Sequence, residues 1–302
     1  MKNLEKQGYR LTGKHSAVKI CNWTRESIRD KGICYKQEFY GIKSHECCQM
    51  TPCLTCNNSC TFCWRSTKNL TGTKLEPPID TPEQIINNCI EQQKQLLIGF
   101  KGYKNTNQKK LQESFKPSLF AISLTGEPTI YPYLKELIQE LKKRKIKSFL
   151  VTNGQFPDKL KDLNPTQLYL SLDAPNKEIY KKLDKPLFKD YWERLLKSLD
   201  ILSKTKTRTC IRITAIKEIN MCNLEQYAEL IKIANPKFVE IKGYMWIGES
   251  RKILKKENMP FHEDVLNFSE ELAKILNWKV IKQKKESRAV LLMKEDKDRL
   301  VK

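Results

Sequence analysis

Short apolar segments alternate with longer amphipathic ones from about residue 48 to the end of the chain. The short segments are rich in β-branched and aromatic residues and end in polar or glycine residues, which is typical of buried strands. The predicted strands are residues 121–126, 146–154, 167–175, 208–216, 237–244 and 278–283. The predicted helices are residues 82–99, 131–145, 190–203, 224–234 and 262–276. Strands and helices in this alternation indicate parallel β/α units.

The ends of the predicted strands indicate where a functional site would form. Parallel strands joined by right-handed crossovers bring the loops at their carboxyl ends to one mouth. The polar strand ends are SLTGEPT (123–129), VTNG (151–154), SLDAP (171–175) and IKGYMW (241–246). The sequence therefore predicts an α/β fold, a barrel or open barrel, with one site built from several strand ends.

Two other regions differ from this pattern. Residues 1–48 have little periodicity and too few apolar residues for a core of their own, so we expect an N-terminal extension wrapped on the main domain. The main domain would comprise residues 49–302 and include a basic C-terminal segment. Residues 100–117 are polar and basic, and we expect a flexible loop there.

The charge balance favours a polyanionic partner. Lys and Arg number 56 against 35 Asp and Glu, a formal net charge of +21 over 302 residues. Nucleic acid is the expected partner. The alternative is a solvated lysine surface of the thermophile kind, but such surfaces usually balance Lys with Glu. No apolar run could span a bilayer and no signal peptide is recognisable, so we expect a cytoplasmic protein with no membrane partner.

The eleven cysteines favour metal binding or catalysis, because cytosolic thiols remain reduced. Cys56, Cys60 and Cys63, here called the loop triad, have the spacing C-x3-C-x2-C. Three thiolates on one cubane iron–sulfur cluster leave one iron free to chelate a small molecule. A structural zinc site is the alternative, but such sites usually contain paired C-x2-C units or nearby histidines, and the chain has only three histidines.

A second set of cysteines is evenly spaced. Cys21, Cys34 and Cys47, here called the N-terminal triad, follow the pattern C-x12-C-x12-C. This pattern would provide a second cluster with an open iron, although separate core thiols are the alternative. The remaining cysteines have no spacing that predicts a shared ligand: Cys48, Cys53, Cys89, Cys210 and Cys222.

The loop triad, with Phe62 before its third cysteine, resembles the radical S-adenosylmethionine superfamily. With both triads present, nearly the whole chain resembles the tRNA 4-demethylwyosine synthases in their archaeal form, which lacks a flavodoxin domain. The resemblance implies a partial (β/α)6 barrel, with S-adenosylmethionine and two [4Fe-4S] clusters as cofactors. It implies a lyase reaction in which N1-methylguanosine in the anticodon loop of phenylalanine tRNA condenses with pyruvate to form 4-demethylwyosine. An external electron donor such as flavodoxin or ferredoxin would be required, and we expect a monomer.

The resemblance also assigns roles to residues. The loop triad would bind the cluster that contacts S-adenosylmethionine, and the N-terminal triad would bind the accessory cluster. Pyruvate would bind the open iron of the accessory cluster or form an imine with Lys36, although an arbitrary lysine in this chain is more often solvated.

Several strand ends resemble the superfamily's cofactor pocket. SLTGEPT resembles its Gly-Gly-Glu strand end, with Thr125 in place of the first glycine. Each motif alone is also ordinary turn chemistry. The residues expected to contact S-adenosylmethionine are Phe62, Thr125, Gly126, Glu127, Asn153, Ser171, Asp173 and Arg212.

Recognition of an unstacked RNA base requires aromatic and basic surfaces. The aromatic candidates are Trp64, Tyr131, Tyr244 and Trp246, for each of which core packing is the alternative. The basic candidates are residues 101–110, 142–147 and 282–288.

Two alternative functions remain open from the sequence. Another radical S-adenosylmethionine enzyme, acting on RNA or a peptide, would share the loop triad but would not explain the N-terminal triad or the charge. A non-enzymatic RNA-binding protein would bind zinc in place of iron and sulfide.

Overall fold

A ten-stranded mixed sheet forms the centre of the computed structural model, which describes residues 2–65 and 70–301. Its strands are β1 (Arg10–Leu11), β2 (Ala17–Val18), β3 (Cys47–Thr51), β4 (Leu119–Ile122), β5 (Lys147–Thr152), β6 (Gln167–Ser171), β7 (Arg208–Ala215), β8 (Phe238–Gly243), β9 (Lys279–Lys284) and β10 (Ala289–Met293). Their order in the sheet is β1-β2-β3-β4-β5-β6-β7-β8-β10-β9. Neighbouring strands from β3 to β8 are parallel, and the pairs at both edges are antiparallel. The parallel part is a partial barrel as predicted, but β3 belongs to it in place of the predicted strand 278–283.

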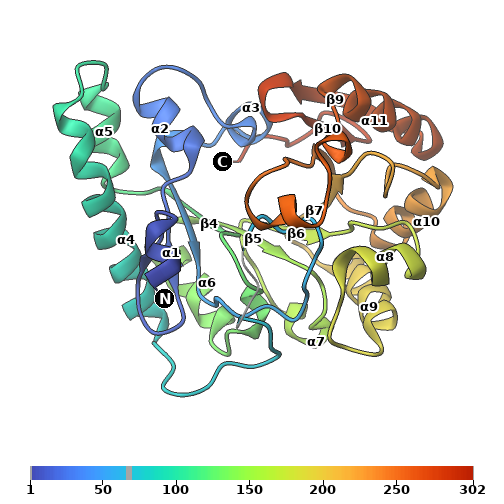
Figure 1. Cartoon of the computed structure of the whole chain (residues 1–302), viewed down its shortest axis with the longest axis horizontal. Coiled ribbons are helices and arrows are strands. Elements are labelled where there is room, and N and C mark those ends of the chain that lie inside the picture. Colours follow the sequence, from blue (N-terminus) through green and yellow to red (C-terminus); the bar gives the residue numbers. More distant parts are fainter. Residues whose placement is uncertain (1, 66–69, 302) are drawn as a thin grey trace.

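Several of the helices cover the outer face of the parallel strands. The helices of the described residues are α1 (Lys2–Lys6), α2 (Asn22–Ile28), α3 (Tyr35–Tyr40), α4 (Pro82–Ile98), α5 (Gln108–Ser114), α6 (Leu134–Lys143), α7 (Pro157–Leu160), α8 (Lys177–Asp184), α9 (Tyr191–Lys204), α10 (Leu224–Ala234) and α11 (His262–Leu276). In Figure 1, α4, α6, α7, α9 and α10 form an arc around the strands. The main hydrophobic core lies between these helices and one face of the sheet. No helix in the described part of the chain has the length and apolarity needed to cross a membrane.

The inner face of the sheet packs against α3. Because successive strand residues point to opposite faces, Val239 and Ile241 of β8 join the outer core, whereas Phe238 joins a second, inner cluster. Tyr40 of α3 lies in that inner cluster, 5.1 Å from Phe238 between ring centroids. Its hydroxyl donates a 2.7 Å hydrogen bond to Glu240 Oε1. The aromatic side chains of α3 therefore fill the concave side of the barrel.

The C-terminal end of the chain holds α3 in place. Arg299 Nη1 donates to the backbone oxygens of Glu38 and Phe39, at 3.0 and 2.6 Å. Val301 N donates to Tyr40 O at 2.8 Å. Segments from opposite ends of the sequence thus stabilise one short helix.

Residues 1–48 contribute more to the sheet than a wrapped extension would. The β2 strand pairs with β3, and β1 pairs with β2, so this part of the chain supplies one edge. The β3 strand begins at Cys47, and therefore crosses the position where we expected the extension to end. The apolar residues of this segment join cores that the rest of the chain completes, which is why its own composition did not predict them as core.

Two local predictions were wrong. Residues 278–283 form a strand as predicted, but β9 is antiparallel to β10, a strand that we did not predict. Only the short turn Lys285–Ser287 joins β9 and β10, and so short a connection requires an antiparallel pair. Within the predicted loop 100–117, α5 forms because Asn107 caps it by accepting from Lys110 N at 3.1 Å, and Leu111 is buried against α2 and α4.

Candidate functional site

A cavity of about 320 Å³ opens at the carboxyl ends of the parallel strands. It is lined by the loop after β3, by the ends of strands β4 to β8 and by the segment after β8. The predicted site residues that line it are Cys56, Cys60, Phe62, Cys63, Thr125, Gly126, Glu127, Asn153, Ser171, Asp173 and Arg212. The fold thus gathers the loop triad and every residue that we expected to contact S-adenosylmethionine.

The loop that carries the triad is held by backbone hydrogen bonds. Cys56 N donates to Leu70 O at 2.9 Å, and Thr61 N donates to Leu183 O, near the end of α8, at 2.8 Å. Cys60 Sγ lies 3.3 Å from Asp184 Oδ1, and Asp184 Oδ2 has no hydrogen-bond partner among the described residues. Asp184 is buried and lines the cavity, and no sequence motif had indicated it.

The loop-triad thiols suit a metal cluster. All three cysteines are free and face one cavity. Burial raises the pKa of Cys56 to about 12 and, more strongly, that of Cys60. Such thiols become thiolates only when a nearby cation compensates the buried charge, which a bound metal does. The donor set therefore fits an iron–sulfur cluster, and the cavity leaves room beside it for a ligand.

Gly126 allows the end of β4 to approach the triad loop. Its φ of +67° favours glycine, and a Cβ there would lie 2.0 Å from the backbone oxygen of Cys53. The next residue completes the contact, because Glu127 N donates to Thr55 O at 2.8 Å. Thr125, which replaces the first glycine of the superfamily motif, is buried and lines the cavity.

The carboxylate of Glu127 is anchored by four donors. Its Oε1 accepts from Thr129 N, Thr129 Oγ1 and Thr152 Oγ1 at 3.0, 2.6 and 2.7 Å. Its Oε2 accepts from Asn153 N at 2.8 Å, the one donor to this atom in the described part of the chain. Burial raises the pKa of this carboxyl, although these hydrogen bonds oppose the increase. A carboxylate offers about four acceptor sites, so Oε2 retains capacity for a ligand.

The later strand ends are held in a similar way. Asn153 Nδ2 donates to Asn57 Oδ1 at 3.0 Å, which joins β5 to the triad loop. Asp173 Oδ1 accepts from Thr214 N at 2.7 Å, and burial raises the pKa of this carboxyl. Arg212 Nε is buried without a hydrogen-bond partner among the described residues. The half-buried Arg212 therefore lines the cavity with one guanidinium N–H unpaired among the described residues.

The N-terminal triad is brought together by three elements. Cys21 precedes α2, Cys34 precedes α3, and Cys47 begins β3. These cysteines do not line the cavity, but their thiols interact electrostatically with one another. Burial and the neighbouring Cys21 raise the pKa of Cys34 to about 11. Burial, together with the neighbouring Cys21 and Cys34, also raises the pKa of Cys47.

Lys36 lies on α3, beside the N-terminal triad. Its side chain is buried, and its Nζ is 4.8 Å from the ring centroid of Tyr169 and 5.5 Å from that of Phe149. Both rings belong to the inner face of the sheet. The solvated-surface alternative for this lysine is therefore wrong.

Lys242 connects the two regions, and the sequence had not indicated it. It lines the cavity, and it interacts electrostatically with Arg212, Cys34 and Lys36. Burial and the neighbouring Arg212 guanidinium lower the pKa of Lys242 to about 8. The sequence held one indication of its burial. In FVEIKG, Glu240 and Lys242 alternate with apolar residues, and both faces of this strand are covered.

The aromatic candidates differ in their exposure to a ligand. Tyr131 is fully buried and donates to Asp80 O at 2.8 Å, so its expected role in base binding is wrong. Tyr244 and Trp64 line the cavity, but Tyr244 is largely buried and donates to Ser250 Oγ at 2.7 Å. Trp246 Nε1 donates to Leu254 O at 2.8 Å. Trp64 lies under two cations, Lys19 Nζ and Arg65 Cζ, at 5.0 and 4.4 Å from a ring centroid.

The basic segments lie at different ends of the sheet. Residues 142–147 lead into the amino end of β5, opposite the cavity. Residues 282–288 reach the cavity edge, because Gly243 N donates to Arg288 O at 2.8 Å. Residues 101–110 pack near α2, where Lys110 pairs with Asp30. Of the three, only residues 282–288 adjoin the mouth.

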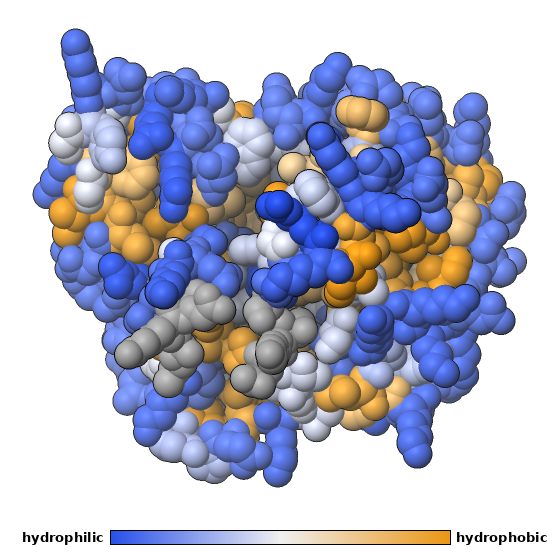
Figure 2. Space-filling view, in the orientation of Figure 1, coloured by the Kyte–Doolittle hydropathy of each residue, from blue (hydrophilic) through white to orange (hydrophobic). Residues whose placement is uncertain are grey.

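The segment after β8 exposes apolar side chains beside basic ones. Met245, Ile247 and Ile253 are exposed there, next to Arg251 and Lys252. In the orientation of Figure 1, Figure 2 shows hydrophilic residues over most of the visible face of the molecule, with apolar residues exposed at several places, including near the centre and on the right side. Gly248 packs this segment against Trp64, since a Cβ there would lie 2.0 Å from Trp64 O.

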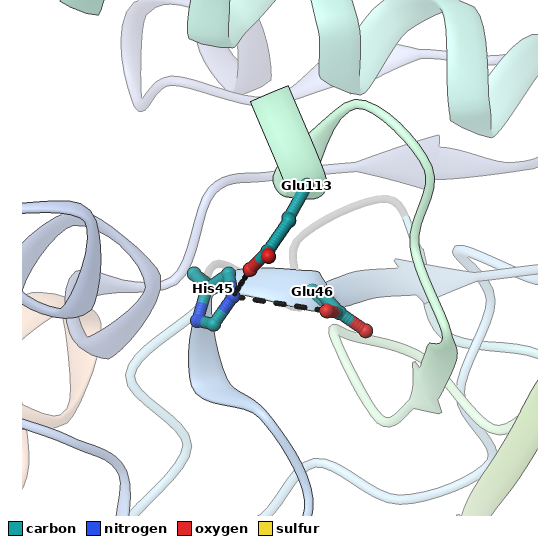
Figure 3. Close-up of side chains that lie close together, drawn as sticks. All are labelled: His45, Glu46 and Glu113. Atoms are coloured by element: carbon teal, nitrogen blue, oxygen red, sulfur yellow. Dashed lines mark hydrogen bonds and ion pairs between the residues drawn. The ribbon is translucent and has the colours of Figure 1, made fainter. Parts of the chain in front are cut away.

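His45, Glu46 and Glu113 form a compact polar cluster away from the cavity (Figure 3). His45 Nε2 lies 2.8 Å from Glu113 Oε2 and 3.7 Å from Glu46 Oε1. Lys43 Nζ pairs with the same Glu46 oxygen at 2.7 Å. Each carboxylate thus has a partner within the cluster, and the cluster joins the segment before Cys47 to α5.

Two family models match the chain. The model described as "Radical SAM superfamily" matches residues 50–231, more than half of the chain, and the one described as "Wyosine base formation" matches residues 233–294. The partial barrel and its cysteine-lined cavity thus define a radical S-adenosylmethionine enzyme. Enzymes of this superfamily use S-adenosylmethionine and a [4Fe-4S] cluster.

Comparison with individual relatives shows which family within this enzyme class the chain belongs to. The S-adenosyl-L-methionine-dependent tRNA 4-demethylwyosine synthase of Pyrococcus horikoshii is 45% identical, over 97% of this chain and 88% of its own. The solved "Structure of TYW1 with a lysine-pyruvate adduct bound" has a TM-score of 0.89 and 38% identity, and "Crystal structure of archaeal TYW1" has 0.81 and 35%. Each comparison covers 98% of this chain and 95% of the other. The chain belongs to the tRNA 4-demethylwyosine synthase family, whose members are radical S-adenosylmethionine enzymes that modify tRNA. The predicted enzyme class, fold class and tRNA substrate are confirmed.

Proposed function

We propose that the protein condenses N1-methylguanosine in the anticodon loop of phenylalanine tRNA with pyruvate, which forms 4-demethylwyosine. The observation that carries this proposal is the pair of amines Lys36 and Lys242. Lys36 is buried beside the N-terminal triad, and Lys242 lines the cavity of the loop triad and interacts electrostatically with Lys36. A solved relative with 38% identity contains a lysine-pyruvate adduct, which supports an amine as the group that holds the keto acid.

The two triads would hold two [4Fe-4S] clusters, and S-adenosylmethionine would occupy the cavity beside the loop triad. When bound together, the loop-triad cluster and S-adenosylmethionine supply a one-electron cleavage whose carbon radical can take hydrogen from a methyl group. Glu127 would accept the cofactor's ammonium group at Oε2, and Arg212 would bind its carboxylate. The remaining contacts would come from Phe62, Thr125, Gly126, Asn153, Ser171 and Asp173.

Lys36 would hold the keto acid covalently. Its amine adds to the ketone carbon and water leaves, which yields an imine that keeps the keto acid's methyl and carboxyl carbons. The Tyr169 and Phe149 rings around Nζ exclude water, and this favours the condensed form over its hydrolysis. Binding of pyruvate to the accessory cluster's open iron is compatible with this role, because Lys36 and the N-terminal triad adjoin each other.

The tRNA would approach the mouth of the barrel. Residues 282–288 and the basic part of the segment after β8 would contact phosphates, and exposed apolar side chains of that segment would contact splayed bases. We further propose that the enzyme acts as a cytoplasmic monomer and takes electrons from an external donor such as flavodoxin or ferredoxin.

The test is anaerobic incubation of the reconstituted enzyme with N1-methylguanosine-containing tRNA, S-adenosylmethionine, pyruvate and dithionite, followed by mass analysis of the nucleosides. The expected result is a heavier, tricyclic guanosine derivative that carries isotope from the ketone and methyl carbons of labelled pyruvate, whose carboxyl carbon leaves. A modified nucleoside without pyruvate carbon would contradict the proposed co-substrate, and no mass gain at all would contradict the reaction.

Binding of tRNA should depend strongly on salt. If the basic surface releases counterions from phosphates, affinity should fall by roughly 100-fold or more between about 50 and 200 mM salt. Filter binding with unmodified and methylated tRNA measures this directly. An affinity independent of salt would contradict electrostatic recognition.

A further inference from the structure

Three cationic side chains lie together on the inner face of the sheet without a compensating ion pair. Within residues 2–65 and 70–301, none of Lys36, Arg212 and Lys242 forms an ion pair with a carboxylate. The ammonium of Lys36 lies over Tyr169, and that of Lys242 lies 5.2 Å from the ring centroid of Tyr35. In the same described ranges, Arg212 Nε has no hydrogen-bond partner.

The nearby carboxylates, Glu240 and Asp173, interact electrostatically with Arg212, but among the described residues neither forms an ion pair with Lys36 or Lys242. Glu240 Oε1 accepts from Tyr40, and Asp173 Oδ1 accepts from Thr214 N. Buried cations in mutual proximity are unfavourable unless an anion joins them. The arrangement therefore indicates that an anionic ligand belongs at this position.

Lys242 is the member of this group best placed to meet a ligand that enters from the cavity. Lys242 and Arg212 line the cavity, whereas Lys36 does not, and the proposed function assigns Arg212 to the carboxylate of S-adenosylmethionine. Lys242 also interacts electrostatically with Lys36. Its strand is central and rigid: Lys242 pairs with Thr214 on β7 and with Ala289 on β10. The carboxylate of a 2-keto acid is bonded directly to the ketone carbon, so it must lie beside whichever amine attacks that carbon.

We propose that Lys242 binds the carboxylate of the keto acid and so directs its ketone carbon to the amine of Lys36. The inference rests on the proposed function and extends it, because it names the residue that selects 2-keto acids over neutral ketones. Lys36 forms the imine bond, and Lys242 supplies the positive charge that binds the substrate's carboxylate.

The experiment compares charged and neutral substrates on the reconstituted protein. Labelled pyruvate or labelled pyruvamide, whose amide replaces the carboxylate, is trapped on the protein with borohydride over a range of concentrations. The variants are Lys242→Met, Lys242→Arg and Lys36→Ala. Lys237→Met is the matched control, because this lysine precedes the amino end of the same strand and lies away from the cavity.

The Lys242→Met variant should raise the half-saturating pyruvate concentration by about 30-fold or more, because one partner of a buried charge pair is lost. Its half-saturating pyruvamide concentration should remain that of the parent. Lys242→Arg should restore most of the preference for pyruvate, and Lys237→Met should behave as the parent does. Iron content is measured on every variant, and it should remain at about eight per chain.

Each other outcome is decisive. Equal effects on pyruvate and pyruvamide, or no effect on either, would overturn the role of Lys242. Loss of about four irons in Lys242→Met would show that the lysine supports the accessory cluster. A peptide map with the adduct on Lys242 would show that Lys242 is the nucleophile. Either result would overturn the inference. Undiminished trapping in Lys36→Ala would instead contradict the amine role in the proposed function, so the two failures are distinguishable.

Discussion

The two cysteine triads differ in how the fold assembles them. The loop triad lies within a single loop, which neighbouring strand ends and α8 hold by backbone hydrogen bonds. The N-terminal triad comes from the starts of three elements, α2, α3 and β3, that meet only when the N-terminal segment packs against the sheet. A cluster bound by the first triad therefore depends on one loop, and a cluster bound by the second depends on tertiary packing.

The largest expected effect follows from breaking the loop triad. Cys60→Ala should lower the iron content from about eight to about four per chain and abolish cleavage of S-adenosylmethionine, because the cluster that contacts the cofactor loses a ligand. Metal analysis and detection of 5′-deoxyadenosine measure both effects. Cys222→Ser is the control, since Cys222 lies outside both triads and should retain iron and activity. Full cofactor cleavage by Cys60→Ala would contradict the assignment.

Breaking the N-terminal triad should have a narrower effect. Cys34→Ala should also lower the iron content to about four, but the loop triad remains intact, so S-adenosylmethionine should still be cleaved without formation of the tricyclic product. The same two assays, with nucleoside mass analysis, separate the triads. If Cys34→Ala retained about eight irons, the cysteine would be a core thiol.

Gly126→Ala tests how the loop triad is held. The new Cβ would meet the Cys53 carbonyl at a φ that disfavours side chains, so we expect a loss of about 3 kcal/mol in the free energy of unfolding. Denaturant unfolding of the metal-free protein measures it. Gly102→Ala, where nothing lies within 4 Å, should be close to neutral, and equal losses in both variants would exclude the proposed contact.

Tyr40→Phe tests how the N-terminal triad is held. The variant leaves buried Glu240 without its hydroxyl donor, so the free energy of unfolding should fall by about 2 kcal/mol. Because α3 follows Cys34 directly, the variant should also lose iron from the accessory cluster sooner during chelation. Tyr133→Phe, at an exposed tyrosine, is the matched control. Unchanged stability would show that α3 does not depend on this hydrogen bond.

The smallest effect is expected at the His45 cluster. The hydrogen bond from His45 lowers the pKa of Glu113, so its contribution to stability is present above the carboxyl's ordinary pKa and is lost as the pH falls through the lowered value. Glu113→Gln should therefore shift the unfolding midpoint slightly at neutral pH and not at strongly acidic pH. It should leave the iron content unchanged. A change in iron content would indicate that this cluster supports the N-terminal triad.

Local sequence was sufficient for the parts of the molecule that depend on short-range chemistry. The helix start at Pro82 follows from the capping box of Thr81 and Gln84, and the parallel strands follow from apolar runs between amphipathic helices. The cavity residues on strand ends were predictable because parallel connections bring those ends together whatever the details of packing. The spacing of the loop triad predicted a shared site for the same local reason.

Long-range packing was needed for the rest. No pattern in residues 35–40 indicates that α3 enters the concave face, because its aromatic residues find their partners on strands as far along the chain as β8. Lys242 could not be separated from the other lysines of so basic a chain until the alternation of β8 placed it between the triads. A side chain's burial and charged neighbours are properties of contacts between distant segments, and these contacts turn a common residue into a functional one.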